Sequence, residues 1–231
     1  MLIEFTGCSS AGKSTIVDSL EASGVGISGE RVMLDIVGLG AAKGTPISLV
    51  VRELLALYGW LRFGPERRTF QNSARLALNS LPRVRWTEKA NRIRNAWRHT
   101  FLFLVLQRHT NPSSVVLIDT GPMHTVHNFF IHTAANANPD DVLSYLELVP
   151  QPDLTVIVKA DKDCLIERTL SRRHRRVANG DRSEATLFVD HSLEVFAVVE
   201  SFLEGNGSLL RVRSDHPAGE IEALLNGTLV P

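Results

Sequence analysis

Cysteine is scarce in this sequence, and its start lacks the marks of a leader. Of the 231 residues only Cys8 and Cys164 are cysteines, so at most one disulfide can form. Six residues precede the first glycine, too few for the apolar region of a secretory signal, and none of them is basic. We therefore expect a cytoplasmic protein whose two thiols stay reduced.

Excess charge of one sign and long apolar runs are missing as well. Lys and Arg number 25, as do Asp and Glu, so no global positive field favours nucleic acid or an anionic membrane. The longest apolar run, FLFLVL at residues 101–106, is far shorter than the roughly 20 residues of a membrane span. The sequence thus predicts neither a nucleic-acid nor a membrane partner.

Short apolar runs alternate along the chain with longer segments of helical periodicity. This alternation is typical of a parallel sheet covered by helices. We predict an α/β fold in three layers, with a five-stranded parallel sheet flanked by helices, as one domain over residues 1–231. The candidate strands lie at residues 2–6, 24–28, 115–119, 154–159 and 208–213.

Two long helices are expected beside the sheet. Between residues 83 and 110, apolar side chains recur at steps of three or four, which places them on one helix face. A second stripe runs through residues 183–204, and Asp181 followed by Glu184 predicts a capping box at its start. Both stripes are interpreted as core. The glycine-rich stretch 36–47 predicts a long loop.

Residues 7–15 read GCSSAGKST and directly follow the first predicted strand. Their glycines, lysine and serine satisfy G-x4-G-K-[ST], and a helix-compatible segment comes next, as in a phosphate-binding loop. The glycines let the backbone curl so that amides and a helix N-terminus face phosphate oxygens. We expect Lys13 to reach the β and γ phosphates of ATP, and Ser14 to bind Mg²⁺. The predicted cofactor-binding residues here are Gly7, Ser9, Ser10, Ala11, Gly12, Lys13, Ser14 and Thr15.

An acid ends the third predicted strand. VVLID, residues 115–119, places Asp119 at the sheet edge where parallel α/β proteins bind ligands. Asp119 is therefore a candidate for holding Mg²⁺ or one of its waters. The alternative is that Asp119 only caps the turn that follows at TGP.

Arginine is concentrated just after the fourth predicted strand, within residues 168–182. Because phosphoryl transfer needs cations, and the arginine fork suits phosphate oxygens, we interpret this segment as a lid with Arg172 and Arg176 as catalytic candidates. The loop around Gly180 supplies the flexibility that closure requires. The alternative is a solvated helix end. The six arginines are Arg168, Arg172, Arg173, Arg175, Arg176 and Arg182.

Further basic side chains lie beside the apolar stripe of the long helix. Arg94 and Arg98, one helical turn apart, are candidates for binding an anionic group of the substrate. The alternative is that most arginines of this helix form a solvated face. His124 and His127 either face an acceptor or lie on a solvated helix face, and no metal site is expected there.

With these elements in order, the sequence resembles the P-loop kinases of small molecules, and most closely the thymidylate kinase-like branch of nucleoside and nucleotide kinases. The likeness rests on GCSSAGKST, VVLIDTGP, PDLTVIVKADKDCLIERTLSRR and LLRVRSDHPAGEIEALL. It implies a P-loop kinase fold with an arginine-bearing lid, and ATP and Mg²⁺ as cofactors. It also implies that the loop after the last strand contacts adenine, which places Ser214, Asp215 and His216 near the base. Thr120 stands where the branch has an arginine after its aspartate.

The candidate for the acceptor side of the reaction is Asp35. A kinase orients an acceptor oxygen in line with the γ-phosphate, and related kinases carry an acid just beyond the second strand. The resemblance therefore makes Asp35 the group that binds the acceptor and takes its proton, unless Asp119 serves both roles. Marks of GTPases are missing, because Pro122 and Val158 stand where those proteins need glycine and asparagine.

The sequence as a whole predicts an ATP-dependent phosphotransferase that acts on a small-molecule acceptor, a nucleoside or nucleotide. The alternatives are a kinase of a non-nucleotide hydroxyl metabolite or antibiotic, and a non-catalytic nucleotide-binding protein. Whether the protein forms a homodimer, and whether the lid arginines act in cis, are left open.

Overall fold

The computed structural model describes residues 1–40, 44–81, 84–111, 113–133, 135–172, 177 and 180–229. Its strands form one five-stranded sheet in the order β2-β3-β1-β4-β5, in which every neighbouring pair is parallel. This confirms the predicted α/β fold and its five-stranded parallel sheet. The strands are β1 (Leu2–Thr6), β2 (Ile27–Ser28), β3 (Val116–Ile118), β4 (Leu154–Lys159) and β5 (Leu209–Arg213).

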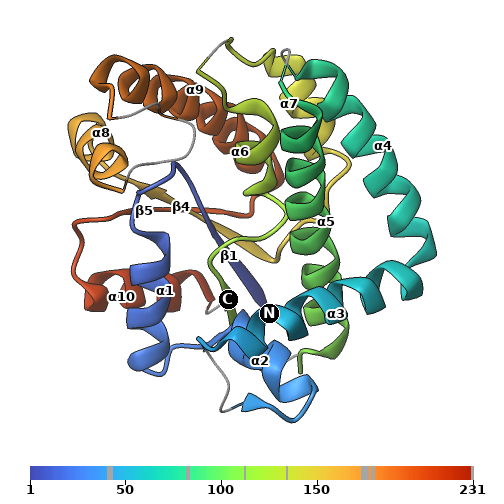
Figure 1. Ribbon diagram of the computed structural model, residues 1–231. Helices are drawn as coiled ribbons and strands as arrows, with labels where there is room; N and C mark the ends of the chain where they lie inside the picture. Colours follow the sequence, from blue (N-terminus) through green and yellow to red (C-terminus); the bar gives the residue numbers. More distant parts are fainter. Residues whose placement is uncertain are drawn as a thin grey trace.

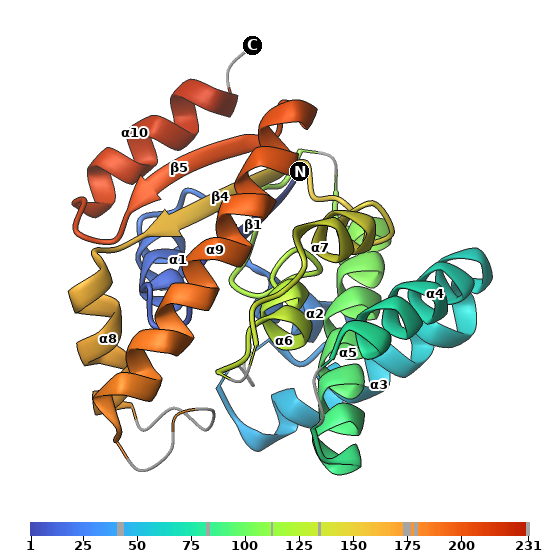
Figure 2. The same cartoon turned by 90° about the horizontal axis from the view of Figure 1, so that it is seen from above.

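Helices cover both faces of the sheet (Figure 1). α1 and α10 pack against each other on one side, whereas α9 packs with α6 and α7 on the other (Figure 2). On the side of the molecule away from β5, α3, α4 and α5 pack together as a helical group (Figure 2). The helices are α1 (Lys13–Ala22), α2 (Gly29–Ile36), α3 (Pro46–Arg62), α4 (Gly64–Ser80), α5 (Trp86–His109), α6 (Thr125–Phe130), α7 (Pro139–Leu146), α8 (Lys162–Ser171), α9 (Arg182–Asn206) and α10 (Ala218–Leu229).

The central strand β1 carries the phosphate-binding loop into the middle of the molecule. All five of its residues are buried, because helices cover both faces of the sheet around it. Four of them are apolar or threonine, whereas Glu4 is an acid with no exposed surface. Since neighbouring parallel strands end at the same edge, the loops after β1, β3, β4 and β5 meet there.

The two long helices occur where apolar periodicity predicts them, as α5 and α9. At the start of α9 the Asp181 carboxylate accepts hydrogen bonds from the amides of Ser183 and Glu184, at 2.7 and 3.4 Å. The capping role of Asp181 is thereby confirmed. Residues 46–80, for which the sequence predicts no element, form α3 and α4. Among the described residues no helix is both long and apolar enough to cross a bilayer.

Candidate functional site

The loop between β1 and α1 has the curled backbone that its glycines predict. Gly7 and Gly12 have positive φ angles of 133° and 95°, and Ser10 also lies in the left-handed region at 65°. A side chain at Gly7 is excluded, because a Cβ there would lie 2.5 Å from the Val158 carbonyl oxygen of β4. Successive amides of this loop therefore line a concave turn at the start of α1.

Lys13, the first residue of α1, is folded back into the loop. Its Nζ donates hydrogen bonds to the carbonyl oxygens of Gly7 and Cys8, at 3.0 and 2.8 Å, and the side chain is only 9% exposed. Burial lowers the pKa of the Lys13 ammonium to about 8, although the Cys8 thiol and the Asp119 carboxylate act in the opposite direction. Lys13 is thus a desolvated cation held at the centre of the loop.

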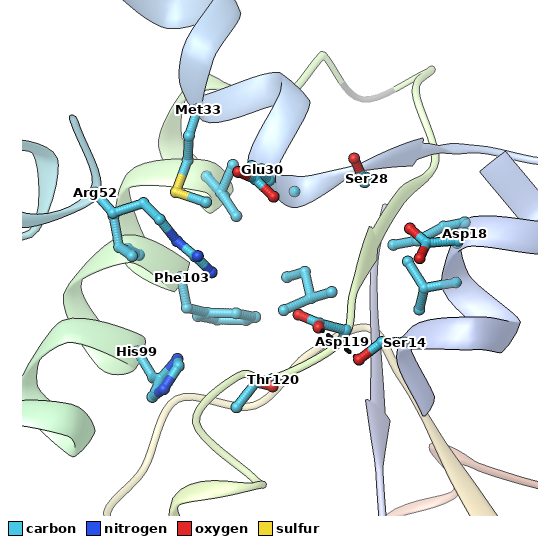
Figure 3. Close-up of a pocket in the computed structure, with 16 residues that line it drawn as sticks. Ser14, Asp18, Ser28, Glu30, Met33, Arg52, His99, Phe103, Asp119 and Thr120 are labelled. Atoms are coloured by element: carbon cyan, nitrogen blue, oxygen red, sulfur yellow. Dashed lines mark hydrogen bonds between the residues drawn. The ribbon is translucent and has the colours of Figure 1, made fainter. Parts of the chain in front are cut away.

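Ser14 and Asp119 are 105 residues apart in the sequence and meet in the structure. The Ser14 hydroxyl donates a hydrogen bond to Asp119 Oδ2 at 3.1 Å, which Figure 3 shows at one side of a pocket. Asp119 directly follows β3, so the strand end positions its carboxylate. A hydroxyl and a carboxylate side by side are oxygen ligands of the kind that Mg²⁺ takes, and they leave room for waters and phosphates.

Glu4 is an acid of the site region that the sequence does not predict. Its carboxylate lies in the middle of β1 and accepts backbone hydrogen bonds from Gly121, Met123 and His124, at 3.1, 3.1 and 2.8 Å. Burial raises the pKa of Glu4 to about 7, and the three amide donors oppose this rise. Glu4 therefore fixes the loop that begins just after Asp119.

Gly121 is the residue that allows this contact. A Cβ on Gly121 would lie 2.5 Å from Glu4 Oε2 and 2.6 Å from its carboxyl carbon. Both distances are shorter than any real contact, so only glycine lets the loop approach the carboxylate. Gly121 and Glu4 thus form a matched pair between β1 and the β3–α6 loop.

The pocket beside Asp119 is lined by α1, α2, α3, α5 and the end of β3. Ser14 and Asp119 lie at one side of it, with Arg52 and His99 at the opposite side and Glu30 above (Figure 3). Between them the wall is apolar. The lining residues are Ser14, Val17, Asp18, Ser28, Gly29, Glu30, Met33, Arg52, His99, Leu102, Phe103, Leu106, Leu117, Ile118, Asp119 and Thr120.

Asp35, the predicted acceptor-side acid, does not line this pocket. It lies on the last turn of α2 with an exposed side chain, next to Gly40, where a Cβ would lie 2.1 Å from Asp35 Oδ1. Glu30, on the first turn of the same helix, lines the pocket instead. One Glu30 oxygen accepts a long hydrogen bond from the Gly44 amide at 3.3 Å. The structure therefore places Glu30, and not Asp35, in the pocket that Asp119 lines.

Arg94 and Arg98 also lie outside the pocket lining. Both point from α5 to Glu53 on α3, with nitrogen to oxygen distances of 3.4 and 3.2 Å. Their neighbour Arg92 is 4% exposed and donates to the Asn128 carbonyl oxygen, so it does not belong to a solvated face. The polar side chains of α3 and α5 that do line the pocket are Arg52 and His99.

The described part of the arginine-rich segment lies against the phosphate-binding loop. Arg168 donates to the Ser10 carbonyl oxygen at 3.3 Å, and Arg172 caps α8 close enough for its charge to help lower the pKa of Lys13. Arg182 pairs with Glu167 on α8. Arg173, Arg175 and Arg176 lie outside the described residues, so the assignment of Arg176 stays a prediction.

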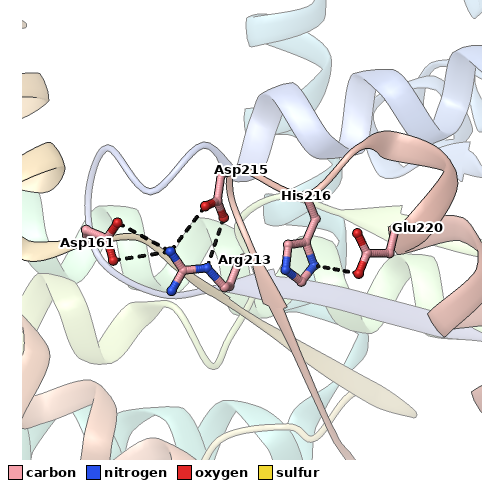
Figure 4. Close-up of polar contacts among 5 residues, drawn as sticks. All are labelled: Asp161, Arg213, Asp215, His216 and Glu220. Carbon is pink, nitrogen blue, oxygen red and sulfur yellow. Dashed lines mark hydrogen bonds and ion pairs between the residues drawn. The ribbon is translucent and has the colours of Figure 1, made fainter.

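The loop after β5 also approaches the phosphate-binding loop. A Cβ on Gly12 would lie 3.6 Å from the Cβ of Ser214, whose amide donates to the Lys159 carbonyl oxygen. Asp215 is held by Arg213, which also pairs with Asp161 at 3.2 Å (Figure 4). The hydrogen bonds and the charge of Arg213 lower the pKa of Asp215. Contact between Asp215 and a base stays a prediction.

The two histidines after β3 belong partly to the core. His127 is 5% exposed, so the interpretation as a solvated imidazole is wrong for this residue. Its ring stacks on that of His124 at a centroid distance of 5.1 Å. His124 Nδ1 lies 3.3 Å from the Thr6 hydroxyl at the end of β1. On α9, Phe196 stacks with His124 and Phe188 contacts His127 edge-on. The two histidines therefore pack the segment after β3 against α9.

Comparison with solved structures identifies the fold. A deoxyadenosine kinase from M. mycoides, with dCMP and a flexible dCDP bound, matches at 12% sequence identity and a TM-score of 0.51, over 99% of this chain and 98% of that chain. The fold is that of a P-loop kinase. The predicted resemblance is thereby confirmed at the level of the fold, and the narrower thymidylate kinase-like assignment stays a prediction.

Two further structures match with lower scores. The same M. mycoides kinase with dATP bound has 12% identity and a TM-score of 0.46, with both chains covered completely. A shikimate kinase from Aquifex aeolicus has 14% identity and a TM-score of 0.41, over 100% of this chain and 99% of that one. No family model matches the sequence, and no curated protein matches it.

Proposed function

We propose that the protein is an ATP-dependent phosphotransferase that moves the γ-phosphate to a hydroxyl group of a small acceptor, a nucleoside or nucleotide. The observation that carries the proposal is the contact between Ser14 and Asp119 next to Lys13, at the edge of a pocket with its own acid. This arrangement offers a donor site and an acceptor site that share one wall. The fold shared with a deoxyadenosine kinase supports it.

The donor side of this mechanism is built by the loop and by α1. The curled backbone directs its amides at phosphate oxygens, and Lys13 exchanges its carbonyl partners for the β and γ phosphates. When bound, Mg²⁺ would supply positive charge that neutralises the phosphates. Ser14 and Asp119 would hold it, while Arg168 and Arg172 bring further positive charge to the loop.

The acceptor side is built by α2, α3 and α5. Glu30 lines the same pocket as Asp119 and is the carboxylate that would orient the acceptor hydroxyl and take its proton. Leu102 and Phe103 form an apolar wall that excludes water from the transfer and packs against the body of the acceptor. We therefore assign to Glu30 the role that the sequence predicts for Asp35.

A pair of substitutions on α2 tests this assignment. Glu30→Gln is expected to lower kcat by about a hundredfold or more, because loss of a positioned base costs 10²- to 10⁴-fold, while ATP binding is unchanged. Asp35→Asn on the same helix is the matched control and is expected to keep the wild-type rate. The reverse result, with Asp35 essential and Glu30 dispensable, would restore the prediction made from the sequence.

An acceptor panel tests the proposed function itself. We would follow ATP consumption with Mg²⁺ and, in turn, 2′-deoxynucleosides, their 5′-monophosphates, shikimate and the neutral methyl ester of shikimate. ATP turnover that depends on one of these acceptors is the expected result. If the protein binds ATP but consumes none with any of these acceptors, the result would instead favour a non-catalytic nucleotide-binding protein, the alternative left open by the sequence.

A further inference from the structure

Arg52 places an unneutralised positive charge in the acceptor pocket. It projects from α3 into the pocket opposite Asp119 (Figure 3). Its Nε is inaccessible to solvent and has no hydrogen-bond partner, and among the described residues no carboxylate lies within ion-pair distance of its guanidinium. Arg52 as a whole is partly buried, but an N–H group that is shielded from water costs free energy unless a hydrogen-bond acceptor pairs with it.

The surroundings of Arg52 do not supply that anion. Glu53, the adjacent acid on α3, is occupied by Arg94 and Arg98 from α5. His99, which shares this end of the pocket, has its pKa lowered to about 3 by burial and by the neighbouring charges of Arg98 and Arg52, so it is neutral. Glu30 and Asp119 line the pocket but make no ion pair with Arg52. The pocket therefore has the cation Arg52 at one side and the acid Asp119 at the other, with Glu30 above them (Figure 3).

We infer that Arg52 binds an anionic group of the acceptor, a phosphate or a carboxylate. The acceptor then lies across the apolar wall formed by Met33 and Phe103, with its anion at Arg52 and its reacting hydroxyl toward Glu30 and Asp119. In a deoxynucleoside 5′-monophosphate this reacting hydroxyl is the 3′-hydroxyl, because the 5′-oxygen already carries the phosphate. The planar fork of arginine suits both kinds of anion. This inference rests on the proposed function and narrows it to a nucleoside monophosphate or a hydroxy acid, in preference to a neutral nucleoside.

Matched pairs of ligands test the inference. With a non-hydrolysable ATP analogue and Mg²⁺ present, we would measure the Kd of deoxyadenosine against its 5′-monophosphate, and of shikimate against its methyl ester. The anionic member of one pair is expected to bind about 10- to 100-fold more tightly, the range of a charged hydrogen bond. The pair that shows the preference distinguishes phosphate from carboxylate.

Substitutions on α3 complete the test. Arg52→Gln is expected to abolish the preference, whereas Arg62→Gln, an exposed arginine on the same helix, keeps it. Equal binding of charged and neutral members by the wild type would overturn the inference. So would an Arg52→Gln variant that loses kcat equally with both members, because Arg52 would then face the transferred phosphoryl group. If only neutral acceptors are phosphorylated, the inference about Arg52 fails but the proposed function stands. If no acceptor is phosphorylated, the proposed function itself is rejected.

A separate observation concerns the outer face of α3, which is apolar and exposed. We define the α3 stripe as Ile47, Val50, Leu54, Leu57, Tyr58 and Leu61, whose exposed fractions run from 45% to 68%. Apart from the adjacent Leu57 and Tyr58, these positions recur at steps of three and four, which places them on one helix face. The opposite face of α3 is buried through Val51, Leu55 and Gly59, so this helix is apolar nearly all round. Such a helix is normally covered on both faces.

We propose that a second copy of the chain covers the α3 stripe. The stripe carries no charge, and all of its positions except Leu57 are symmetric about Leu54. An antiparallel copy therefore pairs Ile47 with Leu61 and Val50 with Tyr58 across a two-fold axis. Its exposed fractions correspond to on the order of 700 Å² per copy, near the ~800 Å² that each partner contributes to a standard interface. A self-complementary apolar helix therefore has the size and symmetry that a homodimer needs.

Sedimentation of the wild type and of charged variants tests the dimer. The wild type is expected to sediment as a dimer at micromolar concentration, and Leu54→Glu or Leu61→Glu as a monomer with unchanged circular dichroism. Leu187→Glu, at a 47% exposed position on α9, is the control and is expected to stay dimeric. A monomeric wild type, or folded α3 variants that remain dimeric, would refute the proposal.

Discussion

Replacement of Lys13 by methionine is expected to lower the rate of phosphoryl transfer by about a thousandfold, while the protein folds as well as the wild type. The rate falls because the ammonium is the buried cation within reach of the transferred phosphate, and loss of one such group costs roughly 10²- to 10³-fold or more. Folding is spared because Lys13 is desolvated, its pKa is lowered to about 8, and methionine fills the same volume without a charge.

The divergence between rate and stability makes this test specific. We would measure kcat with a saturating acceptor, and the melting temperature by circular dichroism. Lys162→Met is the matched control, because Lys162 pairs with Asp190 at the surface of α8 and such pairs contribute little. A Lys13→Met variant with wild-type activity would remove the loop from the mechanism.

Gly121→Ala is expected to lower the free energy of unfolding by about 3 kcal/mol. The added Cβ would lie 2.5 Å from Glu4 Oε2, so the loop after Asp119 must move and give up hydrogen bonds to a buried carboxyl group. Overpacking costs 1–3 kcal/mol, and each hydrogen bond to a charged group about 1.5–3 kcal/mol. Activity should fall as well, since the displaced loop begins at Thr120, which lines the pocket.

A double-mutant cycle separates this contact from a general effect of alanine. In a Glu4→Ala background the new methyl group finds space, so Gly121→Ala should cost at least 1 kcal/mol less than in the wild type. Gly205→Ala, in α9 with nothing near its would-be Cβ, is the control and is expected to stabilise by about 0.5–1 kcal/mol. The free energies of unfolding would be measured by urea denaturation. If the losses caused by the two single substitutions add up to the loss in the double variant, Glu4 and Gly121 are not coupled.

The donor half of the site could be predicted from the sequence because its chemistry is local. In GCSSAGKST the spacing alone requires a strand, a tight turn and a helix start, and the structure has all three. Asp119 follows from its place at the end of an apolar strand, and its contact with Ser14 follows from the shared edge of parallel strands.

The acceptor half could not be predicted, because it depends on how helices rotate against one another. Glu30, Arg52 and His99 come from α2, α3 and α5, and only the packing of α3 on α5 brings them into one pocket. The spacing of Arg94 and Arg98 correctly implies a shared face, but it does not reveal that this face meets Glu53.

Helix α3 and the role of Glu4 are hard to recognise because their sequence signals are weak. α3 is apolar on both faces, so its sequence shows no single stripe from which a helix is read. Glu4 interrupts the otherwise apolar strand LIEFT, and an acid at a buried strand position is the one sign in the sequence that a specific partner is needed. The partner itself, the backbone of the β3–α6 loop, has no sequence signature beyond Gly121.

Transfer of the γ-phosphate is the central claim, and labelled ATP tests it most directly. The protein would be incubated with Mg²⁺, γ-labelled ATP and each member of the acceptor panel, and the products separated. We predict that the label appears covalently on an acceptor with the wild type, and that it stays on ATP with Lys13→Met. Label that is found only in inorganic phosphate or in unchanged ATP, with every acceptor, would contradict the account.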